Sequence, residues 1–289
     1  MTWKAEKQGR NVIQVRVDGS RRNDWEQWFL LSGDRHWDNP KSNHDLQKDH
    51  LEEAVKRNAG IIDIGDLFCA MQGKYDKRSS KSDVRPEHQC DSYLDALVGT
   101  AADFFEPWTK NMIVLGVGNH EEAIRKRHET HLTERLVGIL NDRTGSNICC
   151  GGYGGWVRFV FDWGGSGATK AVLLNYSHGY GGGGPVTKGV IQTNRRATYL
   201  PDAHLVVSGH IHERWTLDLQ RVRINSGGKV YHDTQTHVVV PTYKEEYGDG
   251  YGGWHVERGA PPKPIGAAWL RFWWHNKLAQ VCYDITWAH

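Results

Sequence analysis

Short apolar runs alternate with stretches of helical periodicity in the first part of the chain. Three of these runs fit buried strands, at residues 28–34, 61–66 and 112–118. Residues 43–60 and 91–108, which lie between them, repeat apolar side chains at the spacing of a helix. A further helix is expected after the third run, with apolar positions at Ile124, Leu132, Leu136 and Ile139. Because strand and helix alternate, this part of the chain predicts βαβ units and a mostly parallel sheet.

The pattern changes in the second half, where most apolar runs predict strands. They occupy residues 155–163, 171–179, 203–210, 236–243 and 267–288, and the last run is long enough for a hairpin. These strands predict a second, more antiparallel sheet that packs on the first. No internal repeat and no linker rich in Pro or Ser divides the sequence, so we expect a single domain over residues 1–289.

The composition excludes several classes of protein. A chain of 289 residues can bury a sizeable core, and a formal net charge of +2 gives no general attraction to nucleic acid. The five cysteines are odd in number and lack zinc-finger spacing, which favours a reducing compartment over a disulfide framework. The sequence begins without an apolar leader segment, and no apolar run is long enough to span a bilayer. We therefore expect a soluble, cytoplasmic protein.

Five of the apolar runs are followed by side chains that can bind metal ions. These residues are Asp34, His36, Asp66, Asn119, His120, His178, His210 and His212. In open α/β sheets, ligands bind in the crevice outside the carboxyl ends of the strands. We therefore expect these side chains to converge on one site.

The types of donor restrict the metal. Imidazole mixed with carboxylate suits Mn, Fe, Zn, Ni or Co better than Ca or Mg alone, and a set without cysteine argues against a structural zinc site. Seven ligands are too many for one ion, but they suit two ions that share one carboxylate. Two such ions about 3.5–4 Å apart can hold a phosphoryl group and activate a bridging water for attack on phosphorus. The eighth residue is then left to act as an acid.

Five motifs together resemble those of the calcineurin-like metallophosphoesterase superfamily. In chain order they are DRH, GD, GNHE, SHG and GHIH, and GNHE and GHIH are the most specific of them. The resemblance implies an α/β fold in which a β-sandwich of two mixed sheets is flanked by helices, in four αββα layers. It also implies hydrolysis of a phosphoester at a binuclear metal centre, by attack of a metal-bridging hydroxide on phosphorus.

The resemblance assigns ligands to both ions. One ion would be bound by Asp34, His36 and His212 and the other by Asn119, His178 and His210, with Asp66 as the bridge. Manganese is the first expectation for both positions, with Fe, Zn, Ni, Co and Mg as alternatives.

The resemblance also gives His120 the role of the acid. Its imidazole would lie over the substrate phosphate and protonate the leaving oxygen, or stabilise the charge that builds on the phosphoryl group. Glu121 would orient the His120 ring, and Asp66 would contribute to catalysis through the bridge. Asn119, and Arg35 between two of the ligands, are expected to contact the substrate phosphate together with His120.

Four features leave alternatives open. Cys69 stands where the family often has a second aspartate, which puts the support of the site and the preferred metal in doubt. Residues 69–90 are a long polar segment, either a solvated loop or a lid over the substrate. The basic residues 125–127 fit a solvated helix face better than a contact with a polyanionic substrate. The glycine run within residues 179–189 is either a phosphate cradle or the flexible tip of a hairpin.

The motifs define the reaction more closely than the substrate. Protein phosphatases of the superfamily continue the bridging aspartate with Asp-Arg-Gly, whereas this chain has LFCAMQG. That difference favours the phosphodiesterase and DNA-repair nuclease branches, so we predict a phosphodiesterase that acts on nucleic acid. A phosphomonoesterase for nucleotides or small molecules is the alternative, and a non-catalytic interaction scaffold is less favoured because no ligand is lost. The expected partners are DNA or a nucleotide and, as in related repair nucleases, a second copy of the chain; no membrane is expected.

Overall fold

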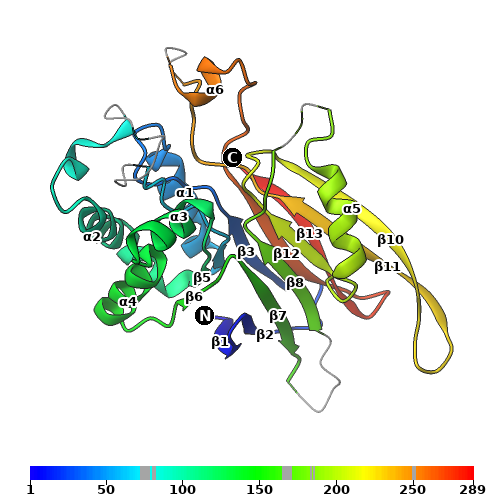
Figure 1. Ribbon diagram of the computed structural model, residues 1–289. Coiled ribbons are helices and arrows are strands. Elements are labelled where there is room, and N and C mark those ends of the chain that lie inside the picture. The colour runs from blue at the N-terminus through cyan, green and yellow to red at the C-terminus, as the bar shows by residue number, and fades with distance from the viewer. Residues whose placement is uncertain (72–78, 80–82, 165–170, 183, 185, 249–251) are drawn as a thin grey trace.

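The computed structural model contains two mixed β-sheets that pack face to face, with helices on their outer faces (Figure 1). It describes residues 1–71, 79, 83–164, 171–182, 184, 186–248 and 252–289. The predicted fold class, an α/β sandwich of two mixed sheets flanked by helices, is confirmed.

The six-stranded sheet holds the three strands predicted in the first part of the chain. Its order is β13 (Gln280–Ala288), β12 (Ala267–His275), β3 (Glu26–Ser32), β4 (Gly60–Asp63), β5 (Met112–Leu115) and β6 (Cys149–Cys150). β3, β4 and β5 are parallel, as the alternation with helices predicts. The C-terminal hairpin forms, but it joins this sheet rather than the second one. β12 pairs with β3, which places Trp269 edge-on against Trp28.

The seven-stranded sheet is more evenly mixed than expected. Its order is β1 (Trp3–Gly9), β2 (Val12–Asp18), β7 (Gly154–Asp162), β8 (Ala171–Ser177), β9 (Leu205–Ser208), β11 (Val230–Val239) and β10 (Trp215–Ile224). β2 and β7, β8 and β9, and β9 and β11 are parallel pairs. β1, β2 and β10 are not predicted above. β1 and β10 lie at the sheet edges and carry many exposed polar side chains, so their apolar signal is weak.

Helices cover both outer faces. Those with four or more residues are α1 (His44–Lys56), α2 (Tyr93–Phe105), η3 (Glu106–Asn111), α3 (Asn119–His128), α4 (Leu132–Thr144), α5 (Val190–Tyr199) and α6 (Trp254–Glu257), and η2 (Pro86–His88) is a single turn. The one helix expected after β5 is two helices, α3 and α4. The break falls at Glu129, which has a left-handed φ of 54°, and His131 caps α4 by accepting the N–H of Glu134. α5 is not predicted from the sequence.

Two apolar clusters fill the spaces between these layers. One lies between the sheets and contains Phe29 and Phe159, whose ring centroids are 4.7 Å apart. The other lies between the six-stranded sheet and the helices that precede and follow β5. Within the described part of the chain, no helix combines the length and apolar character needed to cross a membrane.

The alternatives for two segments stay untested. Residues 72–78 and 80–82 of segment 69–90 are outside the described residues. The glycine run after His178 also includes 183 and 185, which are not described. A lid or a cradle at these places therefore remains a prediction.

Candidate metal centre

Five strand ends meet at one edge of the sandwich. In the six-stranded sheet, Ser32 pairs with Asp63 and Asp63 with Leu115, so β3, β4 and β5 end at the same level. In the seven-stranded sheet, β8 and β9 end level at the pair Ser177 and Ser208. The predicted ligands follow these ends, so both sheets contribute to one site.

The first group of donors contains Asp34, His36 and His212. His212 Nε2 lies 3.2 Å from Asp34 Oδ1 and 3.2 Å from His36 Nε2. Asp34 and His36 are buried, and the side chain of His212 is 15% exposed. These are the three side chains expected to bind one ion, and His212 is the one that borders solvent.

The second group contains Asp66, His178 and His210, with Asn119 beside them. His178 Nε2 lies 3.1 Å from Asp66 Oδ2 and 3.1 Å from Asn119 Oδ1. His210 Nδ1 lies 2.7 Å from the same amide oxygen. His178 Nε2 is also 4.0 Å from Asp34 Oδ1, so the two groups adjoin. The structure thus brings all seven predicted ligands into one cluster.

The backbone of the ligands is strained. Five of them have a left-handed φ: Asp34 (49°), His36 (44°), Asp66 (52°), His210 (70°) and His212 (52°). This conformation costs a residue other than glycine about 1–2 kcal/mol. Such strain persists only where the surrounding structure holds it, and it is concentrated at functional sites.

Two glycines of the GNHE and GHIH motifs make room for the carboxylates. A Cβ on Gly118 would lie 2.0 Å from Asp66 Oδ1, and a Cβ on Gly209 would lie 2.3 Å from Asp34 Oδ2. Because no side chain intervenes, Asp34 Oδ2 can accept the backbone N–H of His210 at 2.8 Å. Asp66 Oδ1 likewise accepts the N–H of His120 at 3.0 Å. Each carboxylate therefore has one oxygen fixed by a backbone N–H and the other directed at the imidazoles.

The donor atoms fit divalent metal ions. Among the described residues, the buried Asp34 Oδ1 has no hydrogen-bond partner, yet the Nε2 atoms of His36, His178 and His212 lie 3.2–4.0 Å away. Neighbouring donors within the groups are 2.7–3.2 Å apart. Such separations match the roughly 3 Å edges of a coordination polyhedron whose metal–ligand bonds are about 2.0–2.2 Å long.

No protein-family model matches the chain, and no curated protein matches it either. Among solved structures, a conserved protein of Streptococcus pneumoniae described as a predicted phosphoesterase aligns with a TM-score of 0.32 and 9% identity, over 91% of this chain and 98% of that one. Vps29 of Entamoeba histolytica, complexed with Zn²⁺, aligns with a TM-score of 0.34 and 9% identity, over 91% of this chain and all of its own. Structural likenesses this weak say nothing about the activity of this chain.

The electrostatics of the site favour a cation. Asp34 and Asp66 are at most 2% exposed, and their described ion pairs are with histidines alone. Burial opposes a charge on His178, but Asp66 and Asp34 outweigh it and raise the pKa of His178 to about 9. Burial lowers the pKa of His36 well below its ordinary value, which leaves a neutral imidazole. The carboxylates thus favour a positive charge at His178, and a metal ion bound there would supply that charge in place of the proton.

His120 lies at the border of the second group. Its Nε2 is 3.8 Å from Asp66 Oδ2, and its Nδ1 lies 2.5 Å from the carbonyl oxygen of Cys69. The carbonyl can only accept, so Nδ1 carries a proton and Nε2 faces the cluster. The ring stands edge-on to His36, with centroids 4.9 Å apart.

Glu121 does not orient His120 as the sequence analysis expected. Its carboxylate accepts the backbone N–H groups of Asp66 at 3.1 Å, Phe68 at 2.8 Å and Gly118 at 2.8 Å. The side chain points back from the start of α3 into the turn after β4, where it is buried. Glu121 therefore positions the backbone of Asp66, and the carbonyl of Cys69 orients His120.

Arg35 also differs from its expected role. Its guanidinium is 1% exposed, and its Nε donates to Asp63 Oδ2 at 2.7 Å. Its Nη2 donates to Ser32 Oγ at 2.9 Å. The guanidinium carbon lies over the ring of Tyr243, 4.9 Å from the ring centroid. Arg35 braces the ends of β3 and β4 from inside the fold, so it is not available to a substrate phosphate.

Two further side chains border the cluster. Cys69 is buried, its thiol has a raised pKa because of that burial, and its Sγ lies within 4.8 Å of ring nitrogens of His36 and His120. Tyr153 stands edge-on to His178 at 5.5 Å and donates its hydroxyl to the carbonyl of Gly179 at 2.7 Å. Sequence analysis missed Tyr153, because a lone aromatic in a glycine-rich stretch carries no motif.

Proposed function

We propose that this chain is a binuclear metal-dependent phosphoesterase of the calcineurin-like type, which hydrolyses a phosphodiester. The observation that carries the proposal is the pair of adjoining donor groups. Asp34, His36 and His212 would hold one ion, and Asn119, His178 and His210 the other. Asp66 would be shared, as the motifs imply: its Oδ2 lies 3.1 Å from His178 Nε2, which is itself 4.0 Å from Asp34 Oδ1 of the first group.

Two ions held in this way would supply a concentrated positive charge for the phosphoryl oxygens and would lower the pKa of a bound water. The chain contributes the geometry. Asp34 and Asp66 are fixed by backbone N–H groups, and Glu121 anchors the turn that carries Asp66. Because these contacts are made before substrate arrives, the site needs little rearrangement during the reaction.

His120 is the proposed acid. Its Nδ1–H donates to the carbonyl of Cys69, so His120 would act as an acid in its doubly protonated form, with the proton for the leaving oxygen on Nε2. That atom faces the metal groups without belonging to either of them. A group at this place can protonate the leaving oxygen as its bond to phosphorus breaks.

The choice of diester and of metal rests on the sequence motifs and the donor set. The absence of the phosphatase-type Asp-Arg-Gly continuation supports a diester, with nucleic acid as the proposed polymer. The imidazole-rich donors support Mn first, with Fe, Zn, Ni, Co and Mg as alternatives. All five cysteines are free, which supports the proposal of a reducing, cytoplasmic compartment.

The test uses purified protein loaded with Mn²⁺ and then freed of excess metal. Metal content is measured by mass spectrometry, and hydrolysis is measured on a chromogenic phosphodiester, a chromogenic phosphomonoester and labelled single- and double-stranded DNA. We expect two ions per chain and cleavage of the diester and of DNA. Cleavage of the monoester alone would replace the proposal with a phosphatase. Two bound ions without turnover on any substrate would contradict catalysis.

A further inference from the structure

A basic pocket opens directly beside the candidate metal centre. The pocket has a volume of about 610 Å³ and includes Asn119 and Tyr153 in its wall. Both residues also touch the second donor group, because Asn119 Oδ1 lies 3.1 Å from His178 Nε2 and the Tyr153 ring stands against His178. A molecule held at the metal centre can therefore extend into this pocket.

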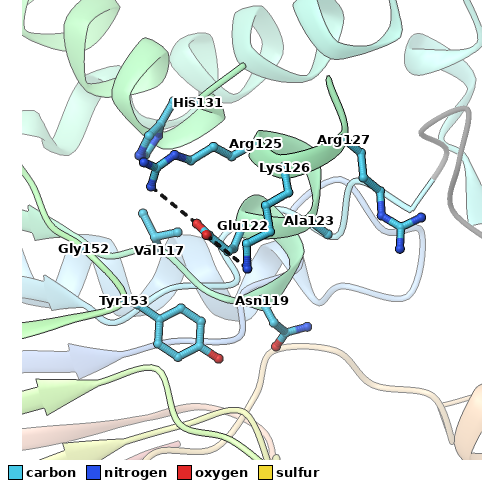
Figure 2. A pocket seen from close by; sticks show the side chains of 10 residues that line it. All are labelled: Val117, Asn119, Glu122, Ala123, Arg125, Lys126, Arg127, His131, Gly152 and Tyr153. Atoms are coloured by element: carbon cyan, nitrogen blue, oxygen red, sulfur yellow. Dashed lines mark ion pairs between the residues drawn. The ribbon is translucent and has the colours of Figure 1, made fainter. Parts of the chain in front are cut away.

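The far end of the pocket is lined by cations from α3. Arg125 and Lys126 contribute to its wall, with Glu122 between them and Asn119 (Figure 2). Asn119, Glu122 and Lys126 lie on one face of the helix, since they are three and four residues apart. Seven residues of helix span about 10 Å, so this face leads from the metal centre to the cations.

The charges of this wall do not cancel. Glu122 Oε2 lies 3.5 Å from Arg125 Nη1, and Glu122 Oε1 lies 3.4 Å from Lys126 Nζ. One carboxylate thus serves two cations, whose side chains are 55% and 71% exposed. The wall therefore carries a net positive charge. It lies far enough from the bond to be cleaved that a second anionic group of the substrate could bind there.

We propose that this pocket binds a second phosphate of the substrate, on one side of the bond that is cleaved. The inference rests on the proposed phosphoesterase function and deepens it, because it makes the substrate a multiply phosphorylated one, a nucleotide or a strand of nucleic acid. Neutral alcohol groups gain nothing from cations, whereas a phosphate gains charge-assisted hydrogen bonds and releases counterions. The volume lies within the range of about 300–1,000 Å³ that is usual for small-molecule sites.

The experiment compares substrates with and without further phosphates next to the bond that is cleaved. Dithymidine monophosphate is compared with the same dinucleotide carrying terminal phosphates, and with a labelled thymidine strand. The enzyme is the Mn²⁺-loaded full chain and its variant Arg125→Gln/Lys126→Gln. We expect the double variant to lose at least tenfold more kcat/KM on the phosphorylated dinucleotide and the strand than on the plain dinucleotide. The slope of a plot of log binding constant for the strand against log salt concentration should become shallower by about 0.7 for each lost phosphate contact.

Three further variants separate this effect from damage to the fold. Arg125→Lys/Lys126→Arg keeps both charges and should restore the preference for the second phosphate. Glu122→Gln removes the counter-charge and should strengthen binding of the strand. Lys4→Gln/Arg16→Gln removes two exposed charges from the β1–β2 hairpin and should leave kcat/KM unchanged on all three substrates.

The outcomes distinguish the inference from the function on which it rests. If Arg125→Gln/Lys126→Gln loses the same factor in kcat/KM on all three substrates, or loses none, the proposed phosphate pocket is wrong, but the proposed phosphodiesterase function is unaffected. If the wild type cleaves no diester, the proposed function fails, and the pocket is judged by fluorescence anisotropy of the labelled strand. Strand binding weakened by Arg125→Gln/Lys126→Gln and strengthened by Glu122→Gln would then support the pocket, and unchanged binding would overturn it. A preference for the strand over the phosphorylated dinucleotide identifies a polymer as the ligand, and the reverse identifies a nucleotide.

Discussion

Asp66 lies where the two donor groups adjoin. Its Oδ1 accepts the N–H of His120, while its Oδ2 faces His178 at 3.1 Å. We predict that Asp66→Asn loses at least one metal ion and all measurable hydrolysis, because the amide removes the negative charge that both ions would share. Metal analysis and the chromogenic diester assay test this prediction. A variant with full metal content and activity would contradict the assignment of Asp66 as the bridge.

His120 should affect the rate without affecting the metals. Its imidazole is not one of the seven predicted ligands, and its Nδ1 is already hydrogen-bonded to the carbonyl of Cys69. We predict that His120→Asn keeps the metal content of the wild type and loses about 10²–10⁴-fold in kcat, the usual contribution of a general acid. The loss should shrink for a diester with a good leaving group, since such a group departs without a proton. An equal loss for good and poor leaving groups would exclude the acid role.

The clustering of the predicted ligands follows from the sequence, whereas the directions of some side chains do not. Asp, Asn and His after successive apolar runs predict the cluster because parallel strands end together. Arg35 lies between Asp34 and His36, which both have a left-handed φ, and this backbone turns its side chain into the core. A local pattern of residue types does not contain that conformation. For the same reason Glu121 reaches back to the turn of Asp66 instead of to His120.

At the scale of elements, the strand ends depend on glycine for space. A Cβ on Gly209 would come within 2.3 Å of Asp34 Oδ2 and 3.4 Å of Ile64 Cδ1. We predict that Gly209→Ala displaces the Asp34 carboxylate and weakens metal binding by about 10–100-fold, as changes in the surroundings of ligands usually do. Titration of the metal-free protein with Mn²⁺ measures the effect.

Gly99 provides the matched control for this variant. It lies inside α2, and a Cβ there would have no heavy atom within 4 Å. Gly99→Ala should stabilise the helix by about 0.5–1 kcal/mol and leave metal affinity unchanged. Equal affinities for Gly209→Ala and Gly99→Ala would remove the spacing argument.

Elements with strong periodicity are predictable here, and those at the edges are not. β3, β4 and β5 are buried along their whole central part, so their apolar runs are unbroken. β10 alternates exposed and half-buried residues at a sheet edge, and α5 buries only Thr193 and Arg196. The partner of β12 is not predictable either, because the choice between two sheets depends on contacts between distant parts of the chain.

At the scale of the whole molecule, the ions would connect the two sheets. Asp34, His36, Asp66 and Asn119 follow strands of one sheet, and His178, His210 and His212 follow strands of the other. A ligand that binds only the folded state at a hundred times its Kd adds about 2.7 kcal/mol to the free energy of unfolding. We predict that a chelator lowers Tm by about 5–10 °C and that Mn²⁺ restores it. Calorimetry of the wild type and of Asp66→Asn, which should show a smaller shift, tests the link.

Two buried histidines away from the centre make stability depend on pH. Burial lowers the pKa of His50 and of His237 from 6.5 to about 4 in the folded chain. Between pH 6.5 and pH 4 these histidines are protonated in the unfolded chain but stay neutral in the folded chain, so the free energy of unfolding falls as the pH falls. Below about pH 4 they are protonated in both states, and their contribution changes little. We predict that the wild type loses about 1–3 kcal/mol per histidine over this range. His237→Gln should flatten the decline in denaturant unfolding measured at pH 7.5 and 5, and an unchanged slope would contradict the assignment.

The strand that leads to Asp34 gains one of its two neighbouring strands only late in synthesis. β3 pairs on one side with β12, so that Leu31 meets Ala268 near the opposite end of the sequence. During synthesis the carboxylates Asp34 and Asp66 leave the ribosome well before His210 and His212 do. A nascent chain therefore has both carboxylates but, of the four predicted imidazole ligands, lacks His210 and His212 until late, and it cannot hold an ion in the final geometry. Metal loading is expected to follow release of the finished chain, so the compartment in which folding ends sets which ion the protein acquires.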